Sequence, residues 1–176
     1  MRPREISNAL GSAAKLQALG VLRPGDSLVE YLAEAMMATM DGHSGRDCGA
    51  SAWALATLGW APSPSWLSAF ALHLEAHAVC NMDAQALSNL LWALGRWNLS
   101  VPTGLMDAVQ TALSPLMLQR CSPQALSNIL WGFSKLSHKP GPVWMASYWE
   151  AVYKVAREGL AEGGKGCQIL KKGNGI

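Results

Sequence analysis

Two triplets of residues combine an amide, an indole and a cation at helical spacing. Each has asparagine at position i, tryptophan at i+3 and a cation at i+7, and the same arrangement occurs twice in the chain. The triplets are Asn89, Trp92 and Arg96, and then Asn128, Trp131 and Lys135. Cations contact phosphates, amides bond base edges and indoles stack on bases, so this pattern could bind single-stranded nucleic acid.

The same residues also have a structural interpretation. A tryptophan at a fixed repeat position is more often a core residue. A recurring asparagine is as readily a buried ladder that satisfies backbone groups. The two cations, Arg96 and Lys135, are therefore the stronger functional candidates. Upstream, Asn8 and Lys15 preserve the polar members of the triplet, so Lys15 joins the candidate RNA-binding residues.

Residue patterns for metal binding or catalysis are weak in this sequence. His73, His77 and Cys80 stand at i, i+4 and i+7, which resembles the spacing of metal ligands. No fourth ligand stands at a suitable spacing, and Glu75 is offset from a zinc-protease motif, so we expect a solvent-facing stripe without metal. The sequence has no glycine-rich phosphate loop or nucleophile elbow. We expect no cofactor and no enzymatic activity.

The elements that position the triplets recur at a constant interval. Trp53, Trp92 and Trp131 are equally spaced, with a period of about 39 residues, and this self-similarity is typical of repeat arrays. The candidate helix caps share the interval and are Ser44, Asp83 and Ser122. We predict an all-α fold, an α-solenoid of about four helical hairpins. The units are about 1–42, 43–81, 82–120 and 121–160.

The third unit shows the predicted plan most clearly. A helix begins after Asp83 and runs to about Trp97, and a second helix follows from Gly104. The apolar stripe of the first helix has i, i+3, i+4, i+7 spacing and comprises Leu87, Leu90, Leu91 and Leu94. Pro115 should kink or end the second helix near Leu113.

The ends of the predicted array are less regular. The first unit has Gly11 where the tryptophan should stand, and its second helix covers about residues 26–40. Residues 161–176 are rich in glycine and lysine and are predicted to form a flexible tail. The terminal units lack the polar caps that such arrays need. We therefore expect the chain to be part of a longer solenoid or of a larger assembly.

Bulk composition narrows the class of protein. The net charge of the chain is only +2, but it is unevenly distributed. Residues 1–95 have a net charge of −3, and residues 96–176 have a net charge of +5. This asymmetry is compatible with a polyanionic partner for the C-terminal half, or with ordinary solubility. No apolar run reaches the roughly 18–20 residues that span a bilayer, so we expect no membrane partner. The four cysteines form no C-x-x-C pair and fit a reducing compartment.

Three phrases resemble octotricopeptide repeats. They are Gln-Ala-Leu-Ser-Asn-Leu-Leu-Trp-Ala-Leu at 85–94, Ser-Pro-Gln-Ala-Leu-Ser-Asn-Ile-Leu-Trp at 122–131 and Pro-Ser-Trp-Leu-Ser-Ala-Phe at 64–70. In that family each degenerate unit is a helical hairpin. One helix opens with a P-x-W-L phrase and the other carries an L-x-N-L-L-W-A-L phrase. The resemblance is strong over residues 62–157, fair over 44–60 and weak over 1–40.

The resemblance implies an RNA-binding protein of the mitochondrial matrix or chloroplast stroma. Family members stabilise, process or activate translation of organellar transcripts, and some sit on organellar ribosomes. Messenger or ribosomal RNA is thus the expected partner, together with other proteins of a larger assembly. The alternative is a protein–protein scaffold in an organellar complex without direct RNA contact.

Overall fold

The computed structural model describes the backbone of residues 1–21 and 25–172, and the side chains up to residue 160 except that of Asp26. Within those residues the chain is helical and has no strand, which confirms the all-α prediction. The α-helices are α1 (Pro3–Ala18), α2 (Asp26–Ala38), α3 (Gly45–Thr57), α4 (Pro64–His73), α5 (Ala84–Trp97), α6 (Thr103–Ala112), α7 (Pro115–Leu118), α8 (Pro123–Lys135) and α9 (Pro142–Lys172).

Three short helical segments of different pitch complete the described chain. They are the 3-10 turn η1 (Met40–Gly42), the π-helical turn η2 (Leu74–Ala78) and the 3-10 turn η3 (Val79–Asn81). None of the helices in the described part of the chain combines the length and the apolar character that crossing a membrane requires.

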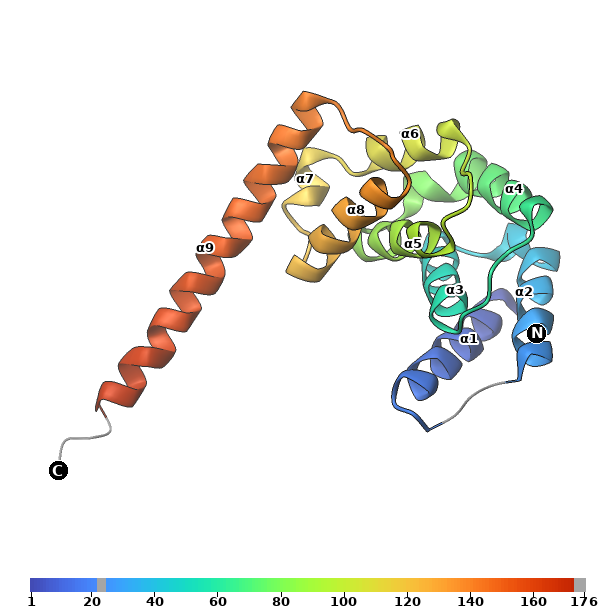
Figure 1. The fold of residues 1–176 in the computed structure, drawn as a ribbon, viewed down its shortest axis with the longest axis horizontal. Helices are drawn as coiled ribbons and strands as arrows, with labels where there is room; N and C mark the ends of the chain where they lie inside the picture. Colours follow the sequence, from blue (N-terminus) through green and yellow to red (C-terminus); the bar gives the residue numbers. More distant parts are fainter. Residues whose placement is uncertain (22–24, 173–176) are drawn as a thin grey trace.

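The helices form two layers (Figure 1). Helices α1, α3, α5 and α8 pack side by side in that order and are called the inner row here. Helices α2, α4 and α6 lie along its outer side, and the long α9 projects from the far end beside α7 and α8. Each outer helix follows an inner helix in the sequence, so the chain alternates between the layers.

The inner helices begin where local capping signals stand in the sequence. Ser44, Asp83 and Ser122 each accept a hydrogen bond from the backbone N–H three residues later. Such bonds satisfy amide groups that the first turn of a helix leaves unpaired. At its other end, α5 stops at Asn98, which adopts a left-handed conformation with φ of 52°. The predicted caps are confirmed.

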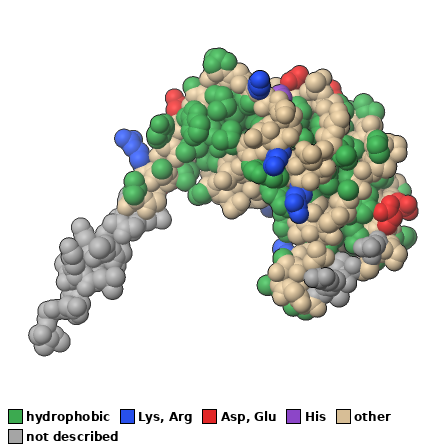
Figure 2. Space-filling model, viewed as in Figure 1, with side chains coloured by type: hydrophobic (Ala, Val, Ile, Leu, Met, Phe, Trp, Pro, Cys, Tyr) green, Lys and Arg blue, Asp and Glu red, His purple; other side chains and the backbone are tan. Residues whose placement is uncertain are grey.

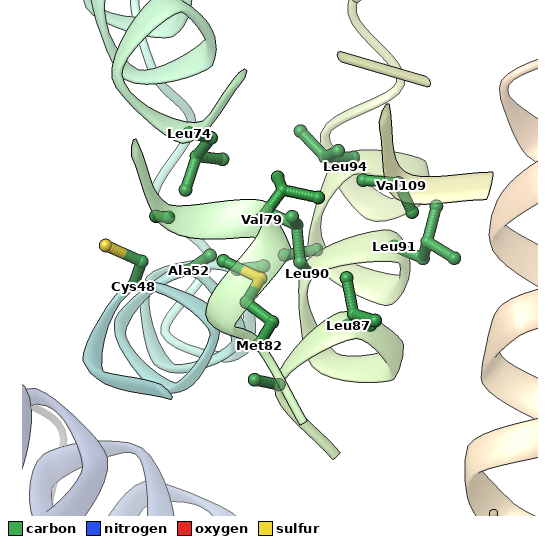
Figure 3. Packing of buried hydrophobic residues seen from close by; sticks show 14 of the residues in the cluster. Cys48, Ala52, Leu74, Val79, Met82, Leu87, Leu90, Leu91, Leu94 and Val109 are labelled. Carbon is green, nitrogen blue, oxygen red and sulfur yellow. The ribbon is translucent and has the colours of Figure 1, made fainter. Parts of the chain in front are cut away.

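The core lies between the two layers (Figure 3). From α5, the four leucines of the predicted stripe all point into it and are at most 1% exposed. Their neighbours come from α3, the 74–82 segment and α6, and include Ala52, Leu74, Val79, Met82 and Val109. Burial of a leucine side chain contributes roughly 1.5–3 kcal/mol, so this stripe fixes which face of α5 turns inward.

Small residues let the inner helices approach closely. A Cβ added to Gly49 would lie 2.5 Å from the carbonyl oxygen of Ala86, where α3 meets α5. One added to Gly132 would lie 2.7 Å from the carbonyl oxygen of Leu91, where α5 meets α8. These contacts leave no space for a Cβ at Gly49 or Gly132. The two glycines therefore fix which face of α3 meets α5 and which face of α8 meets α5.

Pro115 acts as predicted. Helix α6 ends at Ala112, and α7 begins with Pro115 at its first position. There the missing N–H costs nothing, because the first turn has no intrahelical acceptor for it.

The boundary predicted near residue 160, between the array and a flexible tail, falls inside α9. Helix α9 runs through Lys172, well into the segment expected to be a flexible tail, and residues 173–176 lie outside the described residues. Single glycines cost a helix only about 1 kcal/mol each, so Gly163, Gly164 and Gly166 do not end it.

Candidate nucleic-acid interface

The two asparagines of the triplets lie on adjacent helices of the inner row, in the same environment. Gln85 donates through Nε2 to Oδ1 of Asn89 at 2.9 Å, and Gln124 donates in the same way to Asn128 at 2.9 Å. Both asparagines are half-buried and both glutamines are exposed. Of the two interpretations of the asparagines, a ladder to backbone groups is not what these bonds form, because the partner is a glutamine one turn earlier.

Each amide pair leaves hydrogen-bonding groups available. Within the described part of the chain, Nδ2 of Asn89 and Nδ2 of Asn128 have no hydrogen-bond partner. The glutamine oxygens of the two pairs are likewise unengaged by described residues. Each pair thus leaves one amide nitrogen and one amide oxygen wholly free as donor and acceptor groups, besides the second N–H of the glutamine Nε2.

The recurring tryptophans are at the edge of the core. Trp53 and Trp92 are half-buried, and Trp131 is 37% exposed. The Trp92 and Trp131 rings stack with centroids 6.4 Å apart and planes inclined by 30°. No described residue accepts from their indole N–H groups or from that of Trp53. Trp53 and Trp92 pack against the core while remaining partly exposed, so both interpretations, core residue and stacking surface, stay open for them.

A groove runs over α3, α5 and α8 beside these rings. Its volume is about 450 Å³, and its lining consists of Trp53, Gln85, Asn89, Trp92, Gln124 and Asn128. The lining combines two indoles with four amides and contains no ionisable group. A flat, neutral, hydrogen-bonding ligand fits such a lining, which holds no cation to neutralise a phosphate.

Sequence reasoning missed three of the groove residues. Gln85 and Gln124 are separated by the same interval as the tryptophans, and each precedes its asparagine by one turn. That spacing could have identified them. Trp53 was recognised only as a mark of the repeat, because Ala50 stands where the later units have asparagine.

The predicted cations stand at the ends of inner helices. Arg96 lies in the last turn of α5 and Lys135 in the last turn of α8, and both are exposed. Nζ of Lys135 lies 5.7 Å from the centre of the Trp131 ring, in a cation–π contact. Among the described residues neither cation forms an ion pair, so both charges are available to an anion.

The first unit contributes less to this surface. Lys15 lies in the last turn of α1 and is exposed, as is Asn8. Gly11 stands between them, and a Cβ there would have no atom within 4 Å. Without an indole, this end of the row presents a cation and an amide but no stacking surface.

An exposed ion pair joins the starts of α3 and α5. Arg46, at the position equivalent to Gln85 and Gln124, lies 4.0 Å from Asp83, and both side chains are largely exposed, so the pair is weak. Figure 2 shows separate Lys and Arg side chains on the visible face, from its upper edge downward, and Asp and Glu side chains at its upper and right-hand edges.

The histidine and cysteine stripe does not keep its predicted geometry. The chain forms the π turn η2 from Leu74, which changes the helical phase between His73 and Cys80. His73 is only 10% exposed, so the expected solvent-facing stripe is corrected at this residue. Its Nδ1 lies 3.7 Å from Oδ1 of Asp41. The described residues contain no group of three His, Cys, Asp or Glu side chains placed to hold a metal ion.

Two of the thiols are too buried to be reactive. Burial raises the pKa of Cys48 to about 12 and that of Cys121 to about 11. Since the thiolate is the nucleophile, neither side chain is activated at neutral pH.

In comparisons with known proteins, the chain matches no protein-family model and no curated protein.

Proposed function

We propose that the chain is a non-catalytic RNA-binding protein of the mitochondrial matrix or chloroplast stroma. In this proposal it belongs with the octotricopeptide repeat proteins and forms an α-solenoid of about four hairpins, with a period of about 39 residues. It stabilises or positions messenger or ribosomal RNA, in some settings as part of an organellar ribosome. The organellar setting rests on the resemblance of the Asn-Leu-Leu-Trp-Ala-Leu phrase alone.

The observation that carries the proposal is the neutral groove on helices that also carry unpaired cations in their last turns. Its two indoles and four amides suit unpaired bases, which stack on aromatic rings and expose hydrogen-bonding edges. Arg96 and Lys135 are exposed and are not paired with any described carboxylate. Each follows the tryptophan of its helix by one turn, and Lys135 lies over Trp131. Base-binding and phosphate-binding groups thus lie on one surface, as a single strand requires.

The same arrangement favours single strands over duplexes. In an A-form duplex the bases are stacked inside, and proteins reach mainly phosphates and 2′-hydroxyl groups. A groove lined by half-buried indoles gains little from such a surface. We therefore expect the protein to bind loops, ends or other unpaired segments.

The proposal predicts that removing the two cations weakens RNA binding. In a double variant, Arg96→Ala with Lys135→Ala, affinity for a labelled single-stranded RNA of mixed sequence should fall on the order of tenfold at low salt. The slope of log affinity against log salt should become shallower by about 1.4, since each phosphate contact to a single strand contributes about 0.7. Fluorescence anisotropy over a series of salt concentrations measures both quantities.

The matched control carries the same change of charge elsewhere. A variant with Lys139→Ala and Arg157→Ala also loses one lysine and one arginine, from the loop before α9 and from α9 itself. It should retain most of the affinity. Equal losses in the two variants would indicate general attraction to the protein, and unchanged binding in the first would refute the proposed interface.

A second candidate function is a protein scaffold without direct RNA contact. Helix α9 favours it, because large apolar side chains on that helix are exposed to solvent. They are Val143, Trp149, Tyr153 and Leu160. Exposed apolar clusters are typical of protein interaction sites. Partners that remain bound to the purified chain after nuclease treatment of an organellar extract, in the absence of any affinity for RNA, would favour the scaffold.

A further inference from the structure

The groove over α3, α5 and α8 presents the same hydrogen-bonding pattern twice. In both amide pairs the glutamine Nε2 is bound to the asparagine Oδ1 at 2.9 Å. Each pair leaves the glutamine Oε1 as an acceptor and the asparagine Nδ2 as a donor. Because the pairs occupy equivalent positions on neighbouring helices, they offer adjacent donor–acceptor patterns of identical chemistry.

The stacking surface of the groove lies toward Trp53. The Trp92 and Trp131 rings already contact each other at 6.4 Å, which is within the range of an interacting aromatic pair. Lys135 covers Trp131 at 5.7 Å. The groove itself is bounded by Trp53 and Trp92, which come from adjacent helices and both remain half-buried. A base entering the groove therefore stacks on Trp53 or Trp92 rather than between Trp92 and Trp131.

Among the four bases, adenine matches this pattern on two of its edges. Its 6-amino group donates beside the acceptor N7 on one edge and beside the acceptor N1 on the other. Guanine, cytosine and uracil pair a donor with an acceptor on their Watson–Crick edges only. On the Hoogsteen edge guanine presents two acceptors, O6 and N7, and cytosine and uracil have no ring nitrogen there. Adenine is also a purine and offers a larger face for stacking than a pyrimidine does. The geometry points to a site for two consecutive unpaired adenines of an RNA strand.

This inference rests on the proposed function and deepens it, since it names what the groove selects. One adenine is bonded by Gln85 and Asn89, and the next by Gln124 and Asn128. Phosphates of the same strand lie outside the neutral groove, toward Arg96 and Lys135. Identical amide pairs demand identical bases, so a mixed dinucleotide should bind less tightly than two adenines.

The test compares labelled single-stranded RNAs that differ only at two central positions in a uridine background. We expect the strand with two adenines to bind best. Replacement of either adenine by uridine should reduce affinity at least about fivefold, and replacement of both should reduce it further. Because the pairs are equivalent, the two single replacements should have similar effects. Purine riboside, which lacks the 6-amino group, should behave like uridine at either position.

Variants of the amide pairs test whether these side chains cause the preference for adenine over uridine. With Asn89→Ala and Asn128→Ala, strands with two adenines and two uridines should bind within about twofold of each other. Asn8→Ala removes an asparagine at the corresponding position of α1, outside the groove, and should leave selectivity intact. The exposed pair Gln85→Ala and Gln124→Ala tests the same pattern if the asparagine variant does not fold.

The outcomes separate this inference from the proposed function. Equal binding of adenine and uridine strands by the unmodified protein overturns the inference, as does adenine preference that survives in both double variants. If RNA binds without selectivity and still depends on Arg96 and Lys135, the proposed function stands and only the adenine site fails. If no single-stranded RNA binds, both fail.

Discussion

At the scale of single residues, two glycines in inner helices have opposite roles. Gly132 lies at the contact of α5 and α8, where an added Cβ would meet the carbonyl oxygen, carbonyl carbon and Cβ of Leu91 at 2.7–2.9 Å. Gly11 lies inside α1 with nothing within 4 Å of an added Cβ. The first glycine permits helix packing, whereas the second only makes its helix less stable.

Alanine at these positions should therefore have effects of opposite sign. Gly132→Ala forces α8 away from α5 and should lower the free energy of unfolding by about 1–3 kcal/mol. Gly11→Ala should raise it by roughly 0.5–1 kcal/mol, because alanine loses less conformational entropy in a helix. Urea denaturation followed by circular dichroism measures both. A neutral Gly132→Ala would show that the two helices can separate without cost.

The spacing of residues in the sequence predicts which of them are equivalent but not which are exposed. The repeat interval predicted that Asn89 and Asn128 are equivalent, and their identical bonds to Gln85 and Gln124 agree with this. Spacing did not reveal that the nearby tryptophans are half-exposed. Burial depends on which neighbours a side chain meets, and those neighbours are up to three helices away in sequence.

At the scale of elements, indole N–H groups connect the outer layer. Trp66 at the start of α4 donates to the carbonyl oxygen of Ala33 in α2 at 3.3 Å. Trp144 at the start of α9 donates to the carbonyl oxygen of Leu113, just after α6, at 3.0 Å. Both tryptophans follow a proline by two residues, so the P-x-W phrase links an outer helix to its predecessor.

This bond predicts a difference between two tryptophans of the chain. Trp144→Phe leaves the Leu113 carbonyl without its donor and should lower the free energy of unfolding by about 1 kcal/mol or more. Trp131→Phe removes an N–H without a described partner and should change stability by less than about 0.5 kcal/mol. Thermal unfolding of both variants tests the contrast. Equal effects would mean that ring size, rather than the hydrogen bond, determines stability.

The sequence predicted where most helices begin better than it predicted where they end. Inner helices begin after the caps Ser44, Asp83 and Ser122, and α6 ends before Pro115, as expected. These signals act within a few residues, so they can be identified without the fold. The π turn after α4 and the extension of α9 to Lys172 have no comparable local signal.

At the scale of the whole molecule, two histidines make stability depend on pH. His43 is buried between the layers, beside Thr39 Oγ1 at 3.2 Å, and no described residue partners its Nδ1. Burial is the main cause that lowers the pKa of His43, and the nearby His73 adds to it while Asp47 opposes it. Burial also lowers the pKa of His73, with His77 adding and Asp41 opposing.

The sign of the pH dependence follows from these shifts. In the unfolded chain both histidines take up protons near their ordinary pKa of 6.5, whereas in the folded chain they remain neutral to lower pH. Their contribution to stability is therefore complete above about pH 6.5 and is lost as the pH falls toward the folded-state values. The urea midpoint should be flat from about pH 7 to 8 and should decrease toward about pH 5.

Substitution of His43 tests whether this residue causes the loss of stability in acid. In His43→Gln the decrease of the urea midpoint between about pH 6.5 and 5 should be smaller than in the unmodified protein, whatever the change in stability at neutral pH. A similar variant at the exposed His77 should keep most of the decrease. A midpoint that rises toward acid would contradict the assignment.

The sequence by itself determined the helical class, the alternation of helices, the cap positions and the recurring row of Asn, Trp and cation. These depend on signals within one or two helical turns. Only the tertiary structure decided that Trp53 joins Trp92 and four amides in one groove, that Lys135 covers Trp131, and that His73 turns toward Asp41. The physical reason is that close packing at Gly49 and Gly132 brings together side chains of α3, α5 and α8, which are distant in sequence, and no local pattern states which of them remain exposed.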